Sequence, residues 1–213
     1  MAEPLFSEKL KRYLDGLVPP REPELARMEQ YGLRSGFPII GPASGHFCYL
    51  VARLIGARHV FEMGSGYGYS TAWFARAVVE NGGGRVFHVV WDEDLSRRAR
   101  THLDALGYAG VIAYRVDEAI HALRQTEGPF DLIFLDIDKE GYPEALDVIE
   151  SRLRPGGVLL ADNLLWSGAV LDGRDRSAKT QGIRTLTRRV MGGDQWIGSI
   201  VPLRDGLLVA YRR

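Results

Sequence analysis

The sequence predicts an α/β protein with a doubly wound, mostly parallel sheet of seven strands that ends in an antiparallel C-terminal hairpin strand. A short apolar run ends at Met63 and passes directly into a glycine loop and a helix. Further apolar runs then alternate with helical patterns, which is typical of a parallel sheet covered by helices. A turn signal over residues 202–206 separates the last two strand patterns and predicts the hairpin.

Residues 58–70 contain the first strand, the glycine loop and the start of the helix. Gly64, Gly66 and Gly68 let the backbone turn sharply and approach a ligand closely, which side chains would prevent. From Tyr69 onward the helical pattern contains no breaker. Strand, glycine turn and helix are typical of the first half of a Rossmann-like nucleotide-binding unit, whose ligand lies at the helix N-terminus.

The glycine loop does not match two common nucleotide sites. A dinucleotide fingerprint needs a small residue where this chain has Tyr69, and no Gly-Lys-Ser/Thr follows to form a P-loop. Instead, Glu62 stands two residues before a G-x-G-x-G pattern. This pattern resembles the first motif of S-adenosylmethionine-dependent methyltransferases, which implies S-adenosylmethionine as the cofactor.

The residues before the first strand are predicted to be helices and a loop. Apolar residues at helical spacing from Leu10 to Leu17 predict an amphipathic helix. Residues 32–45, rich in glycine and proline, are expected to form a loop. We expect one domain over the whole chain, in which an extension (1–45) precedes a Rossmann-like core (46–213). The extension either covers a sheet edge or dimer face, or forms a flap over the ligand cleft.

Further along the chain, helical spacing of apolar residues predicts helices, and short β-branched, aliphatic and aromatic runs between glycine or proline breaks predict strands. The run at 130–136 is apolar enough to be buried on both faces of the sheet. The helices are expected over residues 4–17, 22–31, 47–55, 69–79, 93–106, 118–125, 141–153 and 180–191. The strands are expected over residues 58–63, 85–90, 111–116, 130–136, 158–162, 196–201 and 207–211.

Composition excludes several classes of partner. Charged residues make up 25% of the chain and the formal net charge is +0, so nucleic acid and anionic membranes are not attracted electrostatically. A single cysteine excludes an internal disulfide. No apolar run approaches the ~18 residues that span a bilayer, and the first residues do not resemble a signal peptide. We therefore expect a cytoplasmic protein with no nucleic-acid or membrane partner.

Two predicted strands end in acidic residues. Asp136 ends the fourth strand, and Asp162, followed by Asn163, ends the fifth. Ligands of open α/β sheets bind outside the carboxyl ends of the strands. Two carboxylates and an amide, with no His or Cys nearby, suit a hard cation such as Mg²⁺. The alternative is that these aspartates cap the segments that follow them.

Lys139 lies three residues after Asp136 on the same loop. Beside a bound cation and partly removed from water, its amine would release a proton more readily and could act as a general base. The alternative is a solvated lysine at the start of a helix. Asp138, which lies between them, either accepts a hydrogen bond from a substrate or faces water.

Three stretches of the chain carry distinctive motifs. Residues 61–70 contain Phe-Glu-Met-Gly and end in Gly-Tyr-Ser, residues 130–142 read Phe-Asp-Leu-Ile-Phe-Leu-Asp-Ile-Asp-Lys-Glu-Gly-Tyr, and residues 162–170 read Asp-Asn-Leu-Leu-Trp-Ser-Gly-Ala-Val. They resemble LEIGxxxGYS, FDLVFIDADKxxY and DNxLWxGxV of the cation-dependent O-methyltransferases, a family that includes catechol and caffeoyl-coenzyme A O-methyltransferases. Asp-Gly-Leu at 205–207 resembles the family's terminal hairpin, so the resemblance covers nearly the whole chain.

The resemblance implies a role for each matched residue. The divalent cation, Mg²⁺ first with Mn²⁺ or Ca²⁺ as alternatives, would be held by Asp136, Asp162 and Asn163. Lys139 would be the catalytic base, and the substrate would contact Asp138 and Ser167. The S-adenosylmethionine site would be lined by Ile40, Glu62, Gly64, Gly66, Ser70, Ala119 and Asp136. The implied reaction methylates one of two adjacent hydroxyl groups of a small substrate, whose acidity the cation increases.

Two positions depart from the family pattern. Where the family has a Glu or Asp that holds the ribose hydroxyls, at the end of the second strand, this chain has Val90. Asp92 lies two residues further on and either takes over the ribose contact or caps the next helix. Ser167 replaces an Asn that lies near the substrate in the caffeoyl-type enzymes, so the substrate's identity stays open.

We therefore predict an S-adenosylmethionine- and divalent-metal-dependent O-methyltransferase for a small, catechol-like substrate with vicinal hydroxyls. Val90 leaves open a non-catalytic domain that keeps the fold and binds a nucleoside or a partner. A nicotinamide-dependent oxidoreductase is disfavoured by Tyr69 and by Val90. By analogy with methyltransferases of this type we expect a homodimer.

Overall fold

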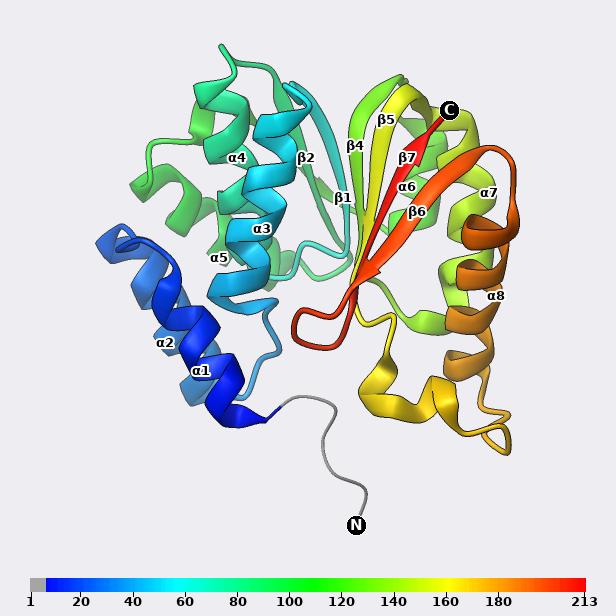
Figure 1. Ribbon diagram of the computed structural model, residues 1–213. Helices are drawn as coiled ribbons and strands as arrows, with labels where there is room; N and C mark the ends of the chain where they lie inside the picture. Colours follow the sequence, from blue (N-terminus) through cyan, green and yellow to red (C-terminus); the bar gives the residue numbers. More distant parts are fainter. Residues whose placement is uncertain (1–6) are drawn as a thin grey trace.

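The computed structural model describes residues 7–213, so the start of the first predicted helix, residues 4–6, lies outside the described residues. One sheet with the strand order β3-β2-β1-β4-β5-β7-β6 carries helices on both faces (Figure 1). The strands are β1 (His59–Met63), β2 (Arg85–Val90), β3 (Ile112–Val116), β4 (Phe130–Leu135), β5 (Leu153–Ala161), β6 (Trp196–Val201) and β7 (Leu207–Arg212). The α-helices are α1 (Glu8–Leu17), α2 (Pro23–Ser35), α3 (Gly41–Leu54), α4 (Tyr69–Glu80), α5 (Glu93–Ala105), α6 (Ala119–Gln125), α7 (Tyr142–Arg152) and α8 (Ala178–Gly192). Three short 3₁₀ helices are η1 (Ala109–Val111), η2 (Lys139–Gly141) and η3 (Trp166–Leu171).

The sheet is doubly wound around β1 and β4. β1 pairs in parallel with both β2 and β4, and β5 continues the parallel order on the far side of β4. β7 is antiparallel to both of its neighbours, β5 and β6. The predicted fold class is therefore confirmed, including the antiparallel last strand. The strand order reverses between β1 and β4, which is where open α/β sheets bind their ligands.

Alternate side chains of the central strands enter two apolar cores. In β1, Val60 belongs to the core under α3, α4 and α5, whereas Phe61 and Met63 belong to the core under α6, α7 and α8. Figure 1 shows these two helix groups on opposite faces of the sheet. Because the central strands are buried on both faces, they are nearly continuous apolar runs in the sequence.

The prediction of a loop over 32–45 is wrong at both of its ends. Helix α2 continues to Ser35 and α3 begins at Gly41, so only residues 36–40 connect them. Gly36 adopts a left-handed conformation (φ 69°) and ends α2 as its cap. Pro42 lies in the first turn of α3, where a missing N–H is tolerated. Glycine and proline therefore mark two helix ends here, and the expected boundary at residue 45 falls inside α3.

Strand β5 begins five residues earlier than predicted. Leu153 already pairs with Phe130, and a register shift follows before Leu132 pairs with Val158. The irregular pairing absorbs residues 155–157, whose proline and glycines predicted a break. The carboxyl end of β5, which places Asp162, is unaffected.

The glycine loop is fixed to α2. The Tyr67 hydroxyl donates to Met28 O (2.9 Å), and the Tyr69 hydroxyl donates to Glu29 Oε1 (3.0 Å). Glu29 also pairs with Arg21 (2.9 Å). Helix α2 thus lies beside the loop and against α4 and α5. Within residues 7–213, no helix has both the length and the apolar character needed to cross a membrane.

Candidate active site

The carboxyl ends of β1, β4 and β5 meet at one edge of the sheet. Asp136 N donates to Met63 O (2.9 Å), and Asp162 N donates to Leu135 O (3.1 Å). A Cβ atom on Gly64 would collide with the Asp136 carbonyl oxygen, so only glycine allows the loop to pass this closely. The structure therefore brings the glycine loop and the two predicted metal-binding aspartates together.

The other two loop glycines are required by packing against protein. Gly66 and Gly68 both have positive φ values, 50° and 91°. A Cβ on Gly66 would lie 3.1 Å from the ring of Phe37, and one on Gly68 would lie 3.0 Å from the Ala99 side chain. These contacts explain both glycines. Approach of a ligand to Gly64 and Gly66 stays a prediction.

Glu62 is a fully buried carboxylate on β1 beneath the start of α4. The Thr71 hydroxyl donates to Glu62 Oε2 and lies 3.0 Å from Nδ1 of His88. Oε1 is buried and has no hydrogen-bond partner among residues 7–213. Burial raises the pKa of Glu62 to about 7, although the hydroxyls of Ser70, Thr71 and Ser65 oppose this shift. A buried, unpaired oxygen at this position suits a hydrogen-bond donor on a bound ligand.

Lys139 is buried in η2 and is held against Asp136. Its Nζ donates to Asp136 Oδ1 (2.8 Å) and to Ile137 O (3.0 Å), and lies 5.0 Å from the centre of the Tyr142 ring. Only 7% of Lys139 is exposed, so the alternative of a solvated lysine is wrong. The Asp138 side chain faces water with 86% exposure, and Lys179 Nζ is 3.9 Å from its Oδ1.

Asp162 is buried at the end of β5 and has a cationic partner. Arg204 Nη1 donates to Asp162 Oδ2 at 2.7 Å, whereas Oδ1 is buried without a partner among residues 7–213. Burial and the charge of Asp136 raise the pKa of Asp162 to about 6, against the opposing charge of Arg204. Asn163 follows, and its amide nitrogen donates to Asp205 Oδ2 (3.1 Å).

Backbone strain is concentrated beside these residues. Within residues 7–213, the non-glycine residues with positive φ are Asn163, Trp166, Ser167 and Arg204. All four belong to two neighbouring loops that Asp205 joins, because its Oδ1 accepts from Ser167 N (2.6 Å) and its backbone carbonyl accepts from Leu165 N (2.8 Å). Such conformations cost free energy and cluster at functional sites.

Arg204 and Asp205 were not predicted as site residues. An Arg-Asp-Gly sequence before a last strand predicts only a turn, and nothing in it identifies the partner of the arginine. Arg204 and Asp205 contact Asp162 and Asn163 because the pairing of β7 with β5 brings this turn against the end of β5.

The donor set fits a hard cation, although it is small. No three His, Cys, Asp or Glu side chains converge as metal ligands in the described part of the chain, and the predicted set has only two carboxylates. Each of the three predicted ligands nevertheless retains an oxygen without a hydrogen bond among residues 7–213: Asp136 Oδ2, Asp162 Oδ1 and Asn163 Oδ1. Carboxylate and amide oxygens of this kind are ligands that Mg²⁺ and Ca²⁺ accept.

The end of β2 has an apolar residue where an acid was expected. The Val90 side chain is buried, and the next residue, Trp91, is 81% exposed. Asp92 Oδ1 accepts from Leu95 N (2.9 Å) and caps α5, so the capping interpretation is confirmed. A ribose contact by Asp92 stays a prediction.

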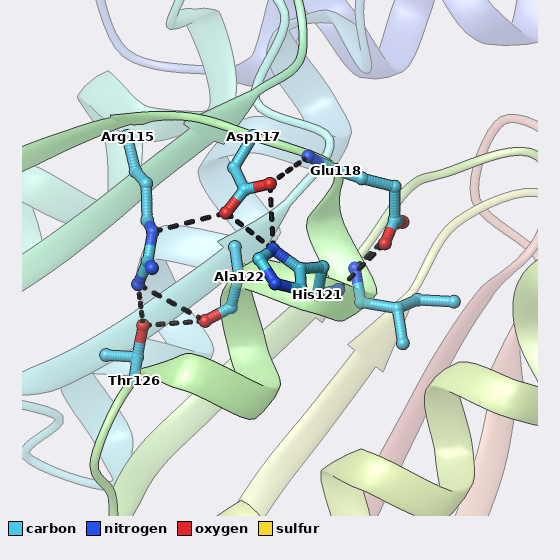
Figure 2. Close-up of polar contacts among 7 residues, drawn as sticks. Arg115, Asp117, Glu118, His121, Ala122 and Thr126 are labelled. Carbon is cyan, nitrogen blue, oxygen red and sulfur yellow. Dashed lines mark hydrogen bonds and ion pairs between the residues drawn. The ribbon is translucent and has the colours of Figure 1, made fainter.

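Ala119 is the first residue of α6. Figure 2 shows the polar contacts of Asp117, Glu118 and His121 at the start of this helix. Glu118 caps the helix by accepting from Ile120 N (2.9 Å) and His121 N (2.7 Å). Asp117 pairs with His121 at 2.9 Å. Ile40, the remaining predicted cofactor residue, is buried directly before α3. The cofactor contacts of Ala119 and Ile40 stay predictions.

Known proteins resemble this chain in sequence and in fold. The O-methyltransferase family matches residues 25–213. A catechol O-methyltransferase from Niastella koreensis is 33% identical over 183 residues, which cover 83% of this chain and 82% of that protein. An O-methyltransferase from Bacillus cereus, solved in complex with SAH, matches with a TM-score of 0.87 and 26% identity over 96% of this chain and 97% of that chain. An O-methyltransferase from Streptomyces achromogenes, in complex with SAM, matches with a TM-score of 0.87 and 26% identity over 100% of this chain and 99% of that chain. The predicted resemblance is thereby confirmed, and the chain belongs to the O-methyltransferase family.

Proposed function

We propose that this protein is a divalent-cation-dependent O-methyltransferase that uses S-adenosylmethionine and methylates a small, catechol-like substrate with two adjacent hydroxyl groups. The observation that carries the proposal is the juxtaposition of Asp136, Asp162 and Asn163, each with an unbonded oxygen, beside the buried Lys139. Three related proteins support it: the relative from Niastella koreensis is a catechol O-methyltransferase, and the two solved structures hold SAH or SAM.

The cofactor site would lie along the glycine loop at the start of α4. Glu62 Oε1, buried and unpaired, would accept a hydrogen bond from the amino group of the methionine part. When bound, S-adenosylmethionine would supply an electrophilic methyl group, and a cation held by Asp136, Asp162 and Asn163 would increase the acidity of the substrate hydroxyl. Ser70 lies in the first turn of α4 and is buried, so its hydroxyl is held close to Glu62.

Lys139 would take the proton from the substrate hydroxyl. A neutral lysine amine keeps two N–H groups, which is enough for its hydrogen bonds to Asp136 and Ile137. The lone pair of Nζ is then available to accept a proton without moving the side chain. The protein's remaining contribution is positioning, because the acceptor oxygen must meet the methyl group in line.

The ends of β4 and β5 are fixed by Tyr142. Its buried hydroxyl lies 2.9 Å from Asp162 O and 3.3 Å from Leu135 O, so it contacts the backbone of both strand ends. This rigid support would keep the ligand oxygens of Asp136 and Asp162 at a constant separation during the reaction.

The test is a methyl-transfer assay with labelled S-adenosylmethionine and catechol. We expect labelled product with Mg²⁺, none after addition of EDTA, and recovery when Mg²⁺ is added in excess. Mn²⁺ and Ca²⁺ in parallel reactions identify the preferred cation. Undiminished product in EDTA would refute the metal requirement, and no product with any of the three cations would refute the catechol-like substrate.

The assembly state and the location remain predictions. We infer a homodimer from analogy with related methyltransferases alone. Sedimentation equilibrium would then give about twice the 23.7 kDa mass of the chain, and a mass equal to one chain would contradict the inference. A cytoplasmic location is expected as before.

A further inference from the structure

Arg204 places a positive charge directly on a predicted metal ligand. Its Nη1 lies 2.7 Å from Asp162 Oδ2. The Asp162 side chain is 2% exposed, whereas that of Arg204 is 28% exposed. The Asp162 carboxylate is thus enclosed by protein, whereas part of the Arg204 side chain is open to solvent.

The backbone of Arg204 adopts a conformation that favours glycine. Its φ is 53°, in the turn between β6 and β7. Glycine would adopt this conformation at little cost, whereas a residue with a Cβ is strained there. The turn is closed by a hydrogen bond from Gly206 N to Leu203 O (2.9 Å). An arginine at this position is therefore explained by its side-chain contact with Asp162 and not by the turn itself.

The ion pair leaves the carboxylate incompletely satisfied. Asp162 Oδ1 has no partner among residues 7–213, and Asp136 is paired with Lys139 at 2.8 Å. Each of the two carboxylates therefore has a basic side chain beside it. A divalent cation that binds Asp162 would lie close to the Arg204 guanidinium, and the two positive charges would repel each other.

We propose that Arg204 is a built-in competitor of the divalent cation: it neutralises Asp162 while the site is empty, and metal binding displaces it. This inference rests on the proposed metal dependence. It predicts that the cation binds more weakly than the same oxygen ligands would bind it without Arg204.

The test compares Mn²⁺ binding by the wild-type protein and by Arg204→Asn and Arg204→Gly, measured by calorimetric titration. Both replacements tolerate a positive φ, so neither strains the turn. We expect each variant to bind Mn²⁺ at least about tenfold more tightly than the wild type, because the competing charge on the ligand oxygen is gone. Unchanged binding of S-adenosylhomocysteine checks that the variants are folded.

Two controls separate competition from a general charge effect. Lys179→Gln removes one positive charge near the Asp138 loop, where its Nζ is 3.9 Å from an exposed carboxylate. We expect it to change Mn²⁺ affinity by less than about twofold, because exposed charges are screened. Adding Asp162→Asn to Arg204→Asn is expected to abolish the gain, since the gain acts through that carboxylate.

The outcomes distinguish this inference from the proposed function. If the wild type binds Mn²⁺ and the Arg204 variants bind it equally or more weakly, competition is refuted and metal dependence stands. A gain of the same size in Lys179→Gln also refutes competition. If neither the wild type nor the variants bind Mn²⁺, metal dependence and the inference fail together.

Discussion

Two arginine–aspartate ion pairs lie at opposite ends of β4 and β5. One pair links the two strands, whereas the other lies at the candidate site. Arg154 Nε is 2.7 Å from Asp131 Oδ1 near the amino end of the two strands. Arg204 Nη1 is 2.7 Å from Asp162 Oδ2 beyond their carboxyl ends. The distances are equal, but the two carboxylates have opposite pKa shifts.

The difference lies in the second oxygen of each carboxylate. Asp131 Oδ2 accepts from the backbone N–H groups of Arg58 and His59, both at 2.8 Å. Burial pushes the pKa of Asp131 up, but these hydrogen bonds and that from Arg154 lower it overall. Asp162 Oδ1 has no partner in the described residues, and burial with the nearby charge of Asp136 raises its pKa. A fully satisfied carboxylate joins strands, whereas an unsatisfied buried one remains available to a ligand.

The largest loss of activity is expected from Lys139→Ala, at the carboxyl ends of β4 and β5, where Asp162 Oδ1 has no partner among residues 7–213. Removing the proposed base should lower kcat for catechol methylation by about 10²- to 10⁴-fold. Lys179→Ala is the matched control, because Lys179 is an exposed lysine near the same loop, and it should retain activity within about twofold. Steady-state kinetics measures both. A loss of less than tenfold in Lys139→Ala would contradict the role of base.

Exchanging each aspartate for asparagine compares the two pairs directly. We expect Asp162→Asn to lower Mg²⁺-dependent activity by about a hundredfold or more, because a charged ligand of the cation is lost. Asp131→Asn lies at the other end of the strands and should keep the activity of its folded fraction within a few fold. The initial rate at saturating substrate distinguishes them. Equal losses in the two variants would remove the functional distinction between the pairs.

The same two variants should rank in the opposite order for stability. Asp131→Asn disturbs hydrogen bonds from two backbone N–H groups and an arginine, so the free energy of unfolding should fall by about 2 kcal/mol. Asp162→Asn replaces a buried carboxylate that its neighbour repels, so its free energy of unfolding should stay within about 1 kcal/mol of the wild type or rise. Urea unfolding at pH 7 gives both values. A larger loss in Asp162→Asn would show that its ion pair is structural after all.

Glu62, a fully buried carboxylate, extends the comparison to the effect of pH on ligand binding. Burial raises its pKa from the ordinary 4.5 to about 7, so its contribution to folding is present below pH 4.5 and is lost as the pH rises through about 7. Binding of the cationic amino group of S-adenosylhomocysteine should have the opposite dependence, because it needs the ionised form. The ionised fraction of Glu62 grows about tenfold from pH 6 to pH 8, and this factor is the upper bound on the expected gain in affinity. Calorimetry should show this gain in the wild type and not in Glu62→Gln.

Local patterns were sufficient to predict the fold and to bring the residues of the candidate site to one edge of the sheet. The strand, glycine loop and helix over 58–70 are contiguous in the sequence, and the acids that end β4 and β5 follow recognisable apolar runs. Parallel pairing then brings the strand ends together, because β1, β4 and β5 are neighbours. The errors at 32–45 and at the start of β5 have a common cause: glycine and proline mark both helix ends and irregular pairing as well as loops.

The partners of the site residues could not be predicted because they come from distant parts of the chain. Arg204 follows Asp162 by 42 residues, and the contact exists only because β7 pairs with β5. Likewise, the cap that Asp92 forms could be recognised only from the backbone geometry at the start of α5. Sequence patterns predicted candidate ligand oxygens, but not which of these oxygens already accept hydrogen bonds from other side chains.

The central claim is that the candidate site, at the carboxyl ends of β1, β4 and β5, binds a catechol-like substrate through a divalent cation. It is tested most directly by calorimetric titration of catechol into protein saturated with S-adenosylhomocysteine, with Mg²⁺ and with EDTA. We predict binding with Mg²⁺, no measurable binding with EDTA, and no Mg²⁺-dependent binding in Asp162→Asn. Equal catechol affinity in Mg²⁺ and in EDTA would contradict the account.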